Sequence, residues 1–378
     1  MLIPSDVSPT VATVDLTALA HNVLQLRRFL SPGCNVMAVV KANAYGHGAV
    51  KTAQALVQQG IGRLAVFSIE EGIVLRQTGI TTSIVILGPV FSQHVEDLVA
   101  HRLTPVVSDP AILTMLGQCA ARYAFPYPIH LKVDTGMGRL GLTHSELETI
   151  LRKHVIPPSL CLEGVMSHLA DSDGLEPGPT EQQVTLFDQA LKVVREAGFS
   201  TPLIHLANSA GIVRFPSAHY SLVRPGIMLY GYHTLPSSVR PPDLRPILSL
   251  TTRIVQLKLI QPGQTVSYNR TFMARRPTRV AVLPIGYSSG VSRRLSNRGQ
   301  VLIRGQRATI AGIVCMDMMM VDVTEIEDIA VGDEVVLIGE QGTERITAQD
   351  IADWSDTISY EVLCAISPKI PRCYRSSS

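Results

Sequence analysis

The stretch NVMAVVKANAYGHGAVKTAQALVQQG, from Asn35 to Gly60, combines a strand, a polar turn and a helix in direct succession. NVMAVV is an apolar run of strand length, and GAVKTAQALVQQG has the apolar spacing of an amphipathic helix. Between them stands Lys41, followed by small residues, a tyrosine and glycines. This order predicts one strand–helix unit of an α/β fold, with a cation at the end of its strand.

The same alternation continues along the chain. The strand-like runs are NVMAVV, GRLAVFS, TSIVILG, LTPVVS, PIHLKVD, LEGVMSH, PLIHLAN and LVRPGIMLYG. Helix-like segments lie between them, such as TEQQVTLFDQALKVVREAG, whose apolar residues recur at spacings of three and four. Eight such units over about 250 residues are typical of a closed parallel barrel. We therefore predict an α/β fold with an N-terminal (β/α)8 TIM-type barrel, and an open doubly wound sheet remains the alternative.

After about Pro246 the pattern changes to β-rich runs separated by QPGQ, NRGQ, RGQ and AVGDE, which are turn signals. TAQDIADWSDT and SYEVLCAIS look like short helices near the end. We expect a barrel domain over residues 1–245 and a mostly β domain over residues 246–378. The first residues, to about position 12, are expected to pack with the second domain.

Composition excludes several classes of protein. Hydrophobic residues make up 46% of the chain, but no apolar run approaches the roughly 18 residues that span a bilayer. The opening MLIPSDVSPTVATVDL has neither a basic nor an apolar leader region, so we expect a cytoplasmic protein without a membrane partner. Six cysteines without CxxC spacing predict neither a metal site nor disulfides. A net charge of +2 without a basic run gives no footprint for nucleic acid, so the expected partner is a small molecule.

Polar residues recur where the predicted strands end. In a barrel of this type the carboxyl ends of the strands form the open, reactive face. A partly desolvated lysine there has a lowered pKa and can form a Schiff base with an aldehyde, although a lone lysine is more often a surface residue. The other strand ends carry Lys132 to Arg139 (KVDTGMGR), His168, Asn208 and Ser209 (HLANSAG), and Arg224.

Each of these residues also has a structural interpretation. His168 or His205 alone could be a hydrogen-bonded core histidine, and LANSAG could be a helix N-cap. Five polar strand ends on one face are better explained by a site. Ser209 and the turn at Pro225 and Gly226 offer donors to an anion, and a phosphate-bearing aldehyde that meets a lysine is pyridoxal phosphate.

These motifs together resemble the alanine racemase family of fold-type III pyridoxal-phosphate enzymes. VVKANAYGHG resembles that family's cofactor-lysine signature. KVDTGMGRLG, HLANSAG, VRPGIMLYG, SYNRTF, PIGY, CMD and SYEVLC follow in the family's order over nearly the whole chain. The resemblance implies an isomerase that interconverts L-alanine and D-alanine and supplies D-alanine for peptidoglycan.

The resemblance also implies roles for single residues. Lys41 carries the cofactor and acts as one acid/base group, while Tyr268 acts on the opposite face of the substrate. Tyr268 and the backbone N–H of Met316 enter from the partner subunit, which implies a homodimer with shared active sites. Taken alone, Tyr268 would be read as a surface aromatic of a strand and CMDMMMVDV as a core strand.

Further residues are implied to bind the cofactor. Arg224, with His168 behind it, faces the pyridine nitrogen, which stays neutral because arginine does not give up its proton. Asn208 also belongs to the cofactor site. The phosphate is held by Tyr45, Ser209, Gly226, Ile227 and Tyr360, and Tyr287 lines the substrate entrance.

Lys132 alternates with apolar residues in IHLKVD, which turns it toward the barrel core. A buried lysine needs a partner or must lose its charge. In many members of the family the equivalent lysine is carbamylated, and that anion would orient Arg139, which holds the substrate carboxylate and the phenolic oxygen of the cofactor. We therefore expect Lys132 to be carbamylated.

The sequence departs from the family pattern at several positions. Asn269 replaces a usual glycine, although asparagine tolerates a left-handed backbone. Ser289, Val291 and Ile313 replace a common aspartate, aromatic and arginine. These changes bear on substrate preference and on the strength of the dimer. Two alternatives therefore stay open: a broad-specificity or serine racemase on the same scaffold, and a non-catalytic pyridoxal-phosphate carrier.

Overall fold

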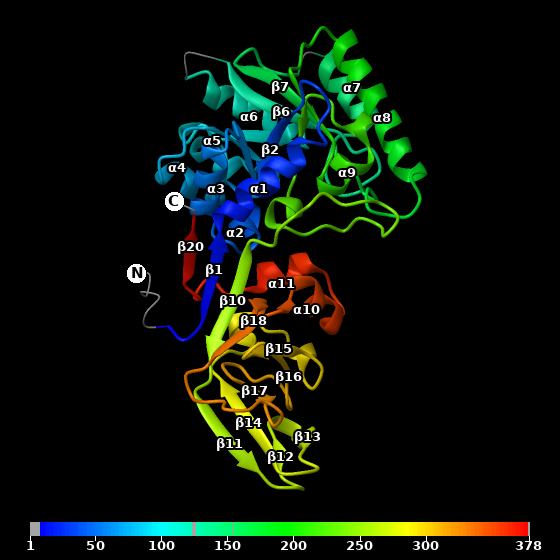
Figure 1. Cartoon of the computed structure of the whole chain (residues 1–378). Helices are drawn as coiled ribbons and strands as arrows, with labels where there is room; N and C mark the ends of the chain where they lie inside the picture. Colours follow the sequence, from blue (N-terminus) through cyan, green and yellow to red (C-terminus); the bar gives the residue numbers. More distant parts are fainter. Residues whose placement is uncertain (1–7, 123–125, 154, 377–378) are drawn as a thin grey trace. The chain divides into compact units, whose positions relative to one another are not determined.

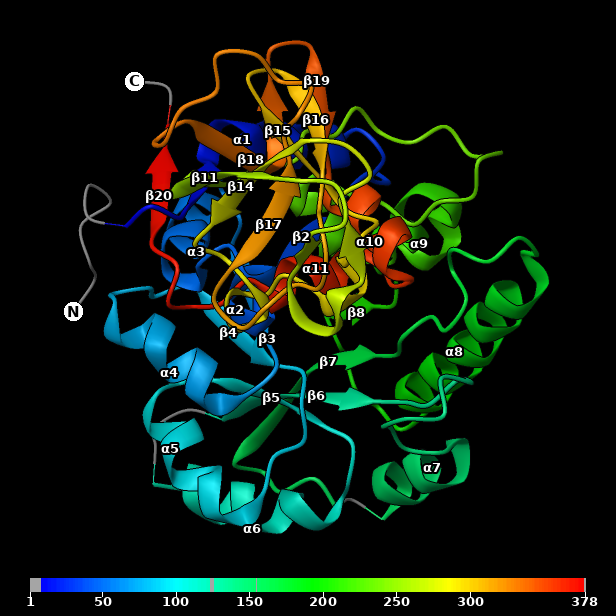
Figure 2. The same cartoon turned by 90° about the horizontal axis from the view of Figure 1, so that it is seen from below.

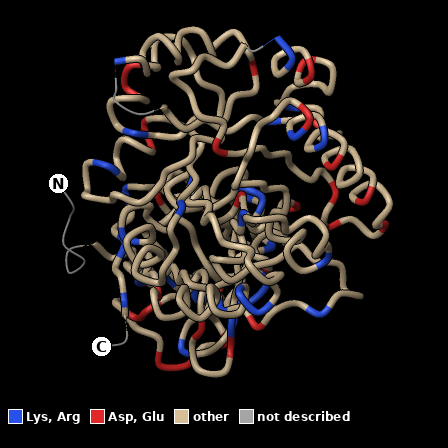
Figure 3. The backbone as a smooth tube through the Cα atoms, turned by 90° about the horizontal axis from the view of Figure 1, so that it is seen from above, with Lys and Arg blue, Asp and Glu red and all other residues tan. Residues whose placement is uncertain are grey.

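The computed structural model describes residues 8–122, 126–153 and 155–376. These residues form two compact units. One comprises residues 8–18, 45–48 and 246–376, and the other comprises the described part of residues 19–44 and 49–245. In the described ranges no helix is both long and apolar enough to cross a bilayer. Acidic and basic residues are interspersed along the chain, without a long run of one sign (Figure 3).

The second unit is built on an eight-stranded parallel sheet, and its strands follow one another in sequence order around the ring. They are β2 (Asn35–Val39), β3 (Arg63–Val66), β4 (Ser83–Ile86), β5 (Thr104–Val107), β6 (Tyr127–Lys132), β7 (Leu160–Met166), β8 (Leu203–His205) and β9 (Leu222–Val223). β9 returns to pair with β2. Backbone hydrogen bonds from Ser221 N–H to Ile204 O (3.2 Å) and from Arg224 N–H to Ala207 O (2.9 Å) join β8 to β9 and close the ring. The predicted barrel is confirmed, and the open doubly wound sheet is excluded.

Helices cover the outside of this barrel, as Figures 1 and 2 show for α5 to α8 beside β5, β6 and β7. The helices are α1 (Leu16–Arg27), α3 (Ala49–Gln58), α4 (Ile69–Gln77), α5 (Val95–Ala100), α6 (Ala111–Ala120), α7 (His144–Arg152), α8 (Gly178–Glu196) and α9 (Ser209–Arg214). The predicted helices at α3 and α8 are confirmed. In α8 the repeating apolar residues Val184, Phe187, Ala190, Leu191 and Val194 are all buried, as their spacing predicts.

The last barrel strand is shorter than the sequence predicts. The run LVRPGIMLYG was expected to be a strand containing Arg224, but β9 ends at Val223 and a 3₁₀ turn, η3 (Ile227–Tyr230), follows. Pro225 has no N–H to donate to the neighbouring strand, so the ladder stops before it. Arg224 therefore lies directly after the strand, at its carboxyl end.

The other unit contains three sheets with mostly antiparallel pairing. A seven-stranded sheet has the order β16-β15-β18-β10-β1-β20, with β19 paired to β18, and β11-β14-β17 and β12-β13 form smaller sheets. The strands are β1 (Val11–Asp15), β10 (Leu248–Arg253), β11 (Gln256–Ile260), β12 (Thr265–Val266), β13 (Phe272–Met273), β14 (Thr278–Leu283), β15 (Gln300–Ile303), β16 (Gln306–Thr309), β17 (Met319–Asp322), β18 (Glu334–Gln341), β19 (Glu344–Ile346) and β20 (Arg372–Arg375). Two short helices, α10 (Ala348–Ser355) and α11 (Ser359–Ala365), occur where they were predicted.

The N-terminal strand β1 belongs to this seven-stranded sheet. It pairs antiparallel with β10 and parallel with β20. Just before it, the hydroxyls of Thr10 and Thr252 are 2.8 Å apart. Residues 1–7 of the predicted N-terminal segment lie outside the described residues, and the predicted bounds of the two domains stay a prediction.

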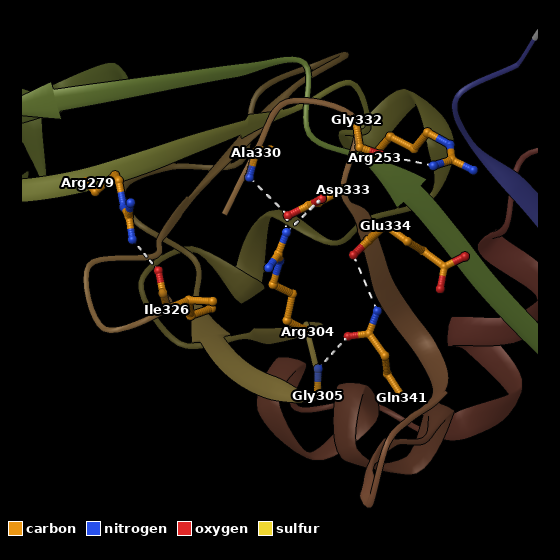
Figure 4. Close-up of polar contacts among 10 residues, drawn as sticks. All are labelled: Arg253, Arg279, Arg304, Gly305, Ile326, Ala330, Gly332, Asp333, Glu334 and Gln341. Atoms are coloured by element: carbon orange, nitrogen blue, oxygen red, sulfur yellow. Dashed lines mark hydrogen bonds and ion pairs between the residues drawn. The ribbon is translucent and has the colours of Figure 1, made fainter. Parts of the chain in front are cut away.

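Hydrogen bonds hold the turns of the β unit in place (Figure 4). In the AVGDE turn the carboxylate of Asp333 accepts from Ala330 N–H (3.0 Å) and from Nε of Arg304 (2.9 Å), as Figure 4 shows. Gly332 in this turn has a φ of 93°, a value that favours glycine. The adjacent RGQ turn is held by Gly305 N–H, which donates to Oε1 of Gln341 (2.9 Å). These two predicted turns are confirmed.

Candidate functional site

Lys41 begins an unusual turn after β2. The next residues, Ala42, Asn43 and Ala44, have φ values of 52°, 55° and 53°, so the chain makes a left-handed turn, α2 (Lys41–Tyr45). A left-handed conformation costs about 1–2 kcal/mol for each residue with a Cβ atom, and such strain gathers at functional sites. This strained turn fixes the direction in which the chain leaves Lys41.

Glu71 stabilises the left-handed turn from the neighbouring helix. Its Oε1 accepts a hydrogen bond from Ala42 N–H (2.6 Å), and its Oε2 accepts from Phe67 N–H (2.8 Å) and Ser68 N–H (3.3 Å). Ser68 and Glu71 form the capping box of α4. The sequence analysis missed Glu71. A serine followed three residues later by a glutamate is a capping signal that can be recognised in the sequence. The hydrogen bond from Ala42 N–H to Glu71 has no such signal.

Lys132 lies at the end of β6 and is buried, with 5% of its surface exposed, as the alternation along this strand predicts. Burial, together with the nearby cations Arg139 and Arg224, lowers the pKa of its amine to about 8, while Asp134 acts in the opposite direction. Lys41 also acts in the lowering direction. A substantial fraction of Lys132 therefore carries a neutral amine near pH 8.

Asp134 folds the loop that carries Arg139. Its carboxylate accepts hydrogen bonds from Gly136 N–H (3.0 Å) and Gly138 N–H (3.0 and 3.1 Å). The loop is closed at its base, because Leu142 N–H donates to Lys132 O (2.7 Å). Arg139 itself is exposed, which leaves its guanidinium accessible to a ligand.

Arg224 is the most buried cation of the predicted site, with 3% of its surface exposed. Nη1 donates to His205 O (2.7 Å) and contacts His205 Nδ1 (2.9 Å). Nη2 donates to Ser167 O (2.7 Å) and Leu206 O (3.0 Å) and contacts His168 Nδ1 (3.3 Å). Burial lowers the pKa of Arg224 to about 9, so the guanidinium stays charged at neutral pH.

His168 lies behind Arg224 and is partly buried. Its pKa is held well below the usual range by burial and by the surrounding cations Arg224, Arg139, Lys132 and Lys41. His168 is therefore neutral at physiological pH. Because all four cations act on the same imidazole, they lie in one cluster around His168.

Gln183 of α8 fixes the loop that carries His168. Its Nε2 donates to His168 O (3.0 Å) and to the hydroxyl of Thr135 (3.2 Å), while its Oε1 accepts from Ala170 N–H (2.8 Å). The sequence analysis missed this residue as well. An isolated glutamine on a helix carries no local signal for such a role.

Ser209 joins the two turns that were predicted to bind phosphate. Its Oγ accepts hydrogen bonds from Gly226 N–H (2.9 Å) and Met228 N–H (3.4 Å). Asn208 is the N-cap of α9, where its Oδ1 accepts from Gly211 N–H (3.0 Å). The N-cap interpretation of LANSAG is therefore confirmed, and the role of Asn208 toward a cofactor stays a prediction.

In the β unit, Tyr45 packs against Tyr360 of α11, with ring centroids 5.9 Å apart. The close approach requires glycine at position 46, because a Cβ atom there would lie 2.1 Å from Leu363 O. Burial raises the pKa of the Tyr45 hydroxyl, and Tyr360 and Cys364 raise it further. Tyr45 therefore remains a neutral hydroxyl.

Tyr268 lies on a strained turn, and 66% of its side chain surface is exposed. Ser267 before it has φ 67° and ψ −175°, a combination that is nearly confined to glycine. The hydroxyl of Ser267 donates to Ile313 O (2.6 Å), which secures this conformation. Asn269 has φ 56°, so it adopts the left-handed backbone that was expected to replace the usual glycine.

Tyr287 and Met316 lie on two loops that run side by side. Tyr287 N–H donates to Cys315 O (3.0 Å), and Ser288 N–H donates to Met316 O (2.9 Å). The hydroxyl of Ser267 is also 3.5 Å from Sγ of Cys315, which places the turn of Tyr268 beside the same loop. Met316 and Tyr287 are 54% and 42% exposed. CMD is thus a loop before β17, and the core-strand interpretation is wrong for Met316.

The structure brings the predicted residues together in three groups, each within one unit. The barrel group is Lys41, Lys132, Arg139, His168, Asn208, Ser209, Arg224, Gly226 and Ile227. The second group is Tyr45 with Tyr360. The third group, which we call the exposed cluster, is Tyr268, Tyr287 and Met316.

A closed parallel barrel with lysine, arginine and histidine at its strand ends defines an α/β-barrel enzyme fold. Comparison with known protein families identifies the family to which the chain belongs. The family model for the alanine racemase N-terminal domain matches residues 14–234, and the model for the alanine racemase C-terminal domain matches residues 247–374. The chain therefore belongs to the alanine racemase family, and the predicted resemblance, fold class and enzyme class are confirmed.

Individual relatives agree with this assignment. The chain is 44% identical to the alanine racemase of Halothermothrix orenii, over 97% of each chain. The alanine racemase of Bacillus anthracis, solved with bound L-Ala-P, is similar in structure with a TM-score of 0.91 at 34% identity, over 97% of this chain and 95% of that one. The enzyme of Bartonella henselae, solved with covalently bound pyridoxal phosphate, has a TM-score of 0.87 at 30% identity, over 97% of this chain and 99% of that one.

Proposed function

We propose that the protein is an alanine racemase that interconverts L-alanine and D-alanine with pyridoxal 5'-phosphate as its cofactor. The observation that carries this proposal is the barrel group, in which Lys41 begins a strained turn beside the buried cations Lys132 and Arg224. Family membership over both domains supports the same activity. A carrier without catalysis would need only the barrel, whereas this chain also has the C-terminal domain.

The residues of the barrel group fit this cofactor. Lys41 supplies an amine for the aldehyde, and the Ser209 hydroxyl together with the turn at Gly226 and Ile227 supplies donors for the phosphate. Tyr45 and Tyr360 are proposed as further phosphate ligands, and Tyr45 keeps its proton because burial raises its pKa. When bound, the cofactor withdraws electrons from Cα of the amino acid and so makes its proton acidic.

Arg224 is proposed to donate a hydrogen bond to the pyridine nitrogen. In the described residues its polar contacts use Nη1 and Nη2, and none involves Nε, so Nε–H is available as a donor. Because the guanidinium keeps its proton at neutral pH, the nitrogen that it contacts stays unprotonated. This limits the electron withdrawal and favours rapid return of the proton to Cα.

Two groups are proposed to exchange the Cα proton on opposite faces. Lys41 acts on one enantiomer and Tyr268 acts on the other, so that a proton leaves one face and a second proton arrives on the other. The backbone N–H of Met316 and the guanidinium of Arg139 are proposed to hold the substrate carboxylate. Tyr287 is proposed to line the substrate entrance.

Lys132 is proposed to be carbamylated. The reaction joins the neutral amine to carbon dioxide, forms one N–C bond and releases one proton, so it needs an uncharged lysine. The lowered pKa of Lys132 supplies that form near neutral pH. The new carboxylate would balance the surrounding positive charge and orient Arg139.

The exposed cluster supports a homodimer with shared active sites. Tyr268, Tyr287 and Met316 expose large apolar side chains on adjacent loops, which is typical of a surface that a partner covers. A cytoplasmic enzyme that supplies D-alanine for peptidoglycan is the cellular role that we propose.

The test is conversion of L-alanine and, separately, of L-serine by the purified protein, with Lys41→Ala as the control. Faster conversion of alanine, with loss of both activity and the visible absorption of the cofactor in the variant, supports the proposal. Comparable conversion of serine would instead identify a broad-specificity racemase. A coloured protein that converts neither would identify a carrier.

A further inference from the structure

Arg224 ends a chain of hydrogen bonds that runs through the barrel interior. Its Nη1 is 2.9 Å from His205 Nδ1, and the Nε2 of His205 is 2.8 Å from His130 Nδ1. The Nε2 of His130 is then 3.3 Å from Oε2 of Glu163. Both histidines are fully buried, whereas the Glu163 side chain is 28% exposed. The chain therefore links a solvent-accessible carboxylate to the buried guanidinium through two imidazoles.

The two ends of this chain fix where its protons lie. A guanidinium can only donate, so His205 Nδ1 must accept and His205 must carry its proton on Nε2. That proton points at His130 Nδ1, which must accept in turn, so His130 carries its proton on Nε2 and donates it to Glu163. The carboxylate at the far end can only accept. Each contact then has one donor and one acceptor, and all donors point from Arg224 toward Glu163.

A charged imidazole does not fit this arrangement. If His130 were an imidazolium, its Nδ1–H would force His205 to protonate Nδ1, and that proton would face the N–H of Arg224. The pKa values of His130 and His205 are both lowered by burial and by the neighbouring cations Arg224 and Arg63, while Glu163 acts in the opposite direction on His130. The pKa of Glu163 is lowered by its hydrogen bond to His130, so it remains an anion.

An irregularity in the backbone of β7 places Glu163 at the end of this series of hydrogen bonds. Along β6 and β7, Ile129 pairs with Leu162 but His130 pairs with Gly164, so Glu163 is an extra residue in a bulge. A bulge changes the direction of a side chain relative to the regular alternation of a strand. Gly164 provides the room for the imidazole, because a Cβ atom there would lie 2.8 Å from the His130 ring.

We propose that Glu163, His130 and His205 form a polarised relay that orients Arg224 and holds it as a donor toward the bound cofactor. The three are positioning residues, and their effect on racemisation rests on the proposed function. Without the carboxylate, the Nε2 proton of His130 loses its acceptor, and the polarisation of His205 Nδ1 toward Arg224 weakens. Outside the relay, Arg224 also contacts His168 and lies near Lys132, while Arg63 lies near Glu163.

The decisive variants are Glu163→Leu, which removes the acceptor, and Glu163→Gln, which keeps an acceptor oxygen without the charge. The holoenzyme is labelled with nitrogen-15 in its histidines, and Gln substitutions of His130 and His205 assign the signals. In the native holoenzyme we expect both rings to be neutral with the proton on Nε2 between about pH 6 and 9. In Glu163→Leu we expect the Nδ1 signal of His205 to shift, although Glu163 does not touch that ring, and we expect a much smaller shift in Glu163→Gln.

Kinetics provide the second readout. We expect Glu163→Leu to lower kcat for alanine by about tenfold with KM nearly unchanged, and Glu163→Gln to lower it by less than about threefold. A charged ring, a proton on Nδ1, an unmoved His205 signal or an unchanged kcat in Glu163→Leu would overturn the relay. A native protein that does not racemise alanine would instead overturn the proposed function, while the histidine signals would still report on the relay.

Discussion

Arg224 in the barrel unit is 3% exposed and makes five polar contacts, whereas Tyr268 in the β unit is 66% exposed. Both stand beside irregular backbone, since Arg224 follows the end of β9 and Tyr268 follows the strained Ser267. In the barrel the functional side chains are fixed by their neighbours. In the β unit the backbone of the turn is fixed, but the side chain lies open.

This difference indicates how the two parts of the proposed site are completed. The barrel group is already organised within one chain, where buried carbonyls and imidazoles satisfy Arg224. The exposed cluster has large exposed side chains, and we propose that the partner subunit covers them. Substitutions in the barrel group should therefore act within one subunit, and substitutions in the exposed cluster should also act through the dimer.

The largest effect is expected for Lys41→Ala. Loss of the amine that holds the cofactor and exchanges the proton should reduce kcat for alanine by more than about a thousandfold and abolish the visible absorption of the cofactor. The matched control is Lys51→Ala, which changes an exposed lysine of α3. Retention of both colour and activity in Lys41→Ala would show that the barrel group does not hold the cofactor as proposed.

Tyr268→Phe tests the other unit by removal of one hydroxyl. We expect kcat to fall by roughly a hundredfold, with the cofactor absorption retained, because the barrel group still binds the cofactor. Tyr220→Phe is the control, since the Tyr220 hydroxyl contacts Asp188 on the outside of the barrel. Equal activity of the two variants would remove Tyr268 from the chemistry.

Met316→Glu should weaken the dimer. A carboxylate in the exposed cluster must lose its water when a partner covers it, so we expect the dimer dissociation constant to rise at least about tenfold. Sedimentation equilibrium over a dilution series measures this constant. The control is Met115→Glu, at a methionine of α6 that is 41% exposed, and it should leave the dissociation constant unchanged. An unchanged dissociation constant in both variants would contradict the assignment of the exposed cluster to the dimer interface.

Lys132 gives the stability of the barrel a defined pH dependence. Its pKa is lowered from 10.5 to about 8 in the folded protein, so the unfolded chain binds more protons between these values. In buffer free of carbon dioxide, the free energy of unfolding should therefore gain a contribution from Lys132 as the pH rises from about 8 to 10.5. Lys132→Met should flatten this part of the profile in denaturant titrations, and an unchanged slope would contradict the lowered pKa.

Asn269→Ala should give the smallest change. Alanine in the left-handed conformation at φ 56° should destabilise the β unit by about 1 kcal/mol, whereas Asn269→Gly should be nearly neutral. Thermal unfolding measures both. A neutral Asn269→Ala would show that the turn of Tyr268 tolerates another backbone conformation.

Much of the fold could be predicted because each strand–helix unit carries a local signal. The apolar periods of residues 35–60 and 180–198 correspond to elements of the structure within a few residues. The length of β9 could not be read from its apolar run, because Pro225 ends the pairing. The assignment of Tyr45 to Gly48 to the β unit depends on packing against α11, which no local pattern reveals.

The site was predictable where single residue types carry chemistry, as at Lys41, Lys132 and Arg224. The supporting residues were not. Glu71 acts through a left-handed turn, and Glu163 acts through a bulge that shifts the register by one residue. Both depend on backbone irregularities, and these are set by tertiary packing rather than by the residues nearby.

The central claim is that the barrel group of one chain works with Tyr268 of another. Mixing the Lys41→Ala and Tyr268→Phe proteins, each with strongly reduced activity, under conditions that exchange subunits tests it directly. Heterodimers with shared sites contain one site with both native residues, so L-alanine conversion should return to about one quarter of the native rate after random mixing. No recovery, with exchange verified by a mass-tagged subunit, would mean that Lys41 and Tyr268 act from the same chain and would contradict the account.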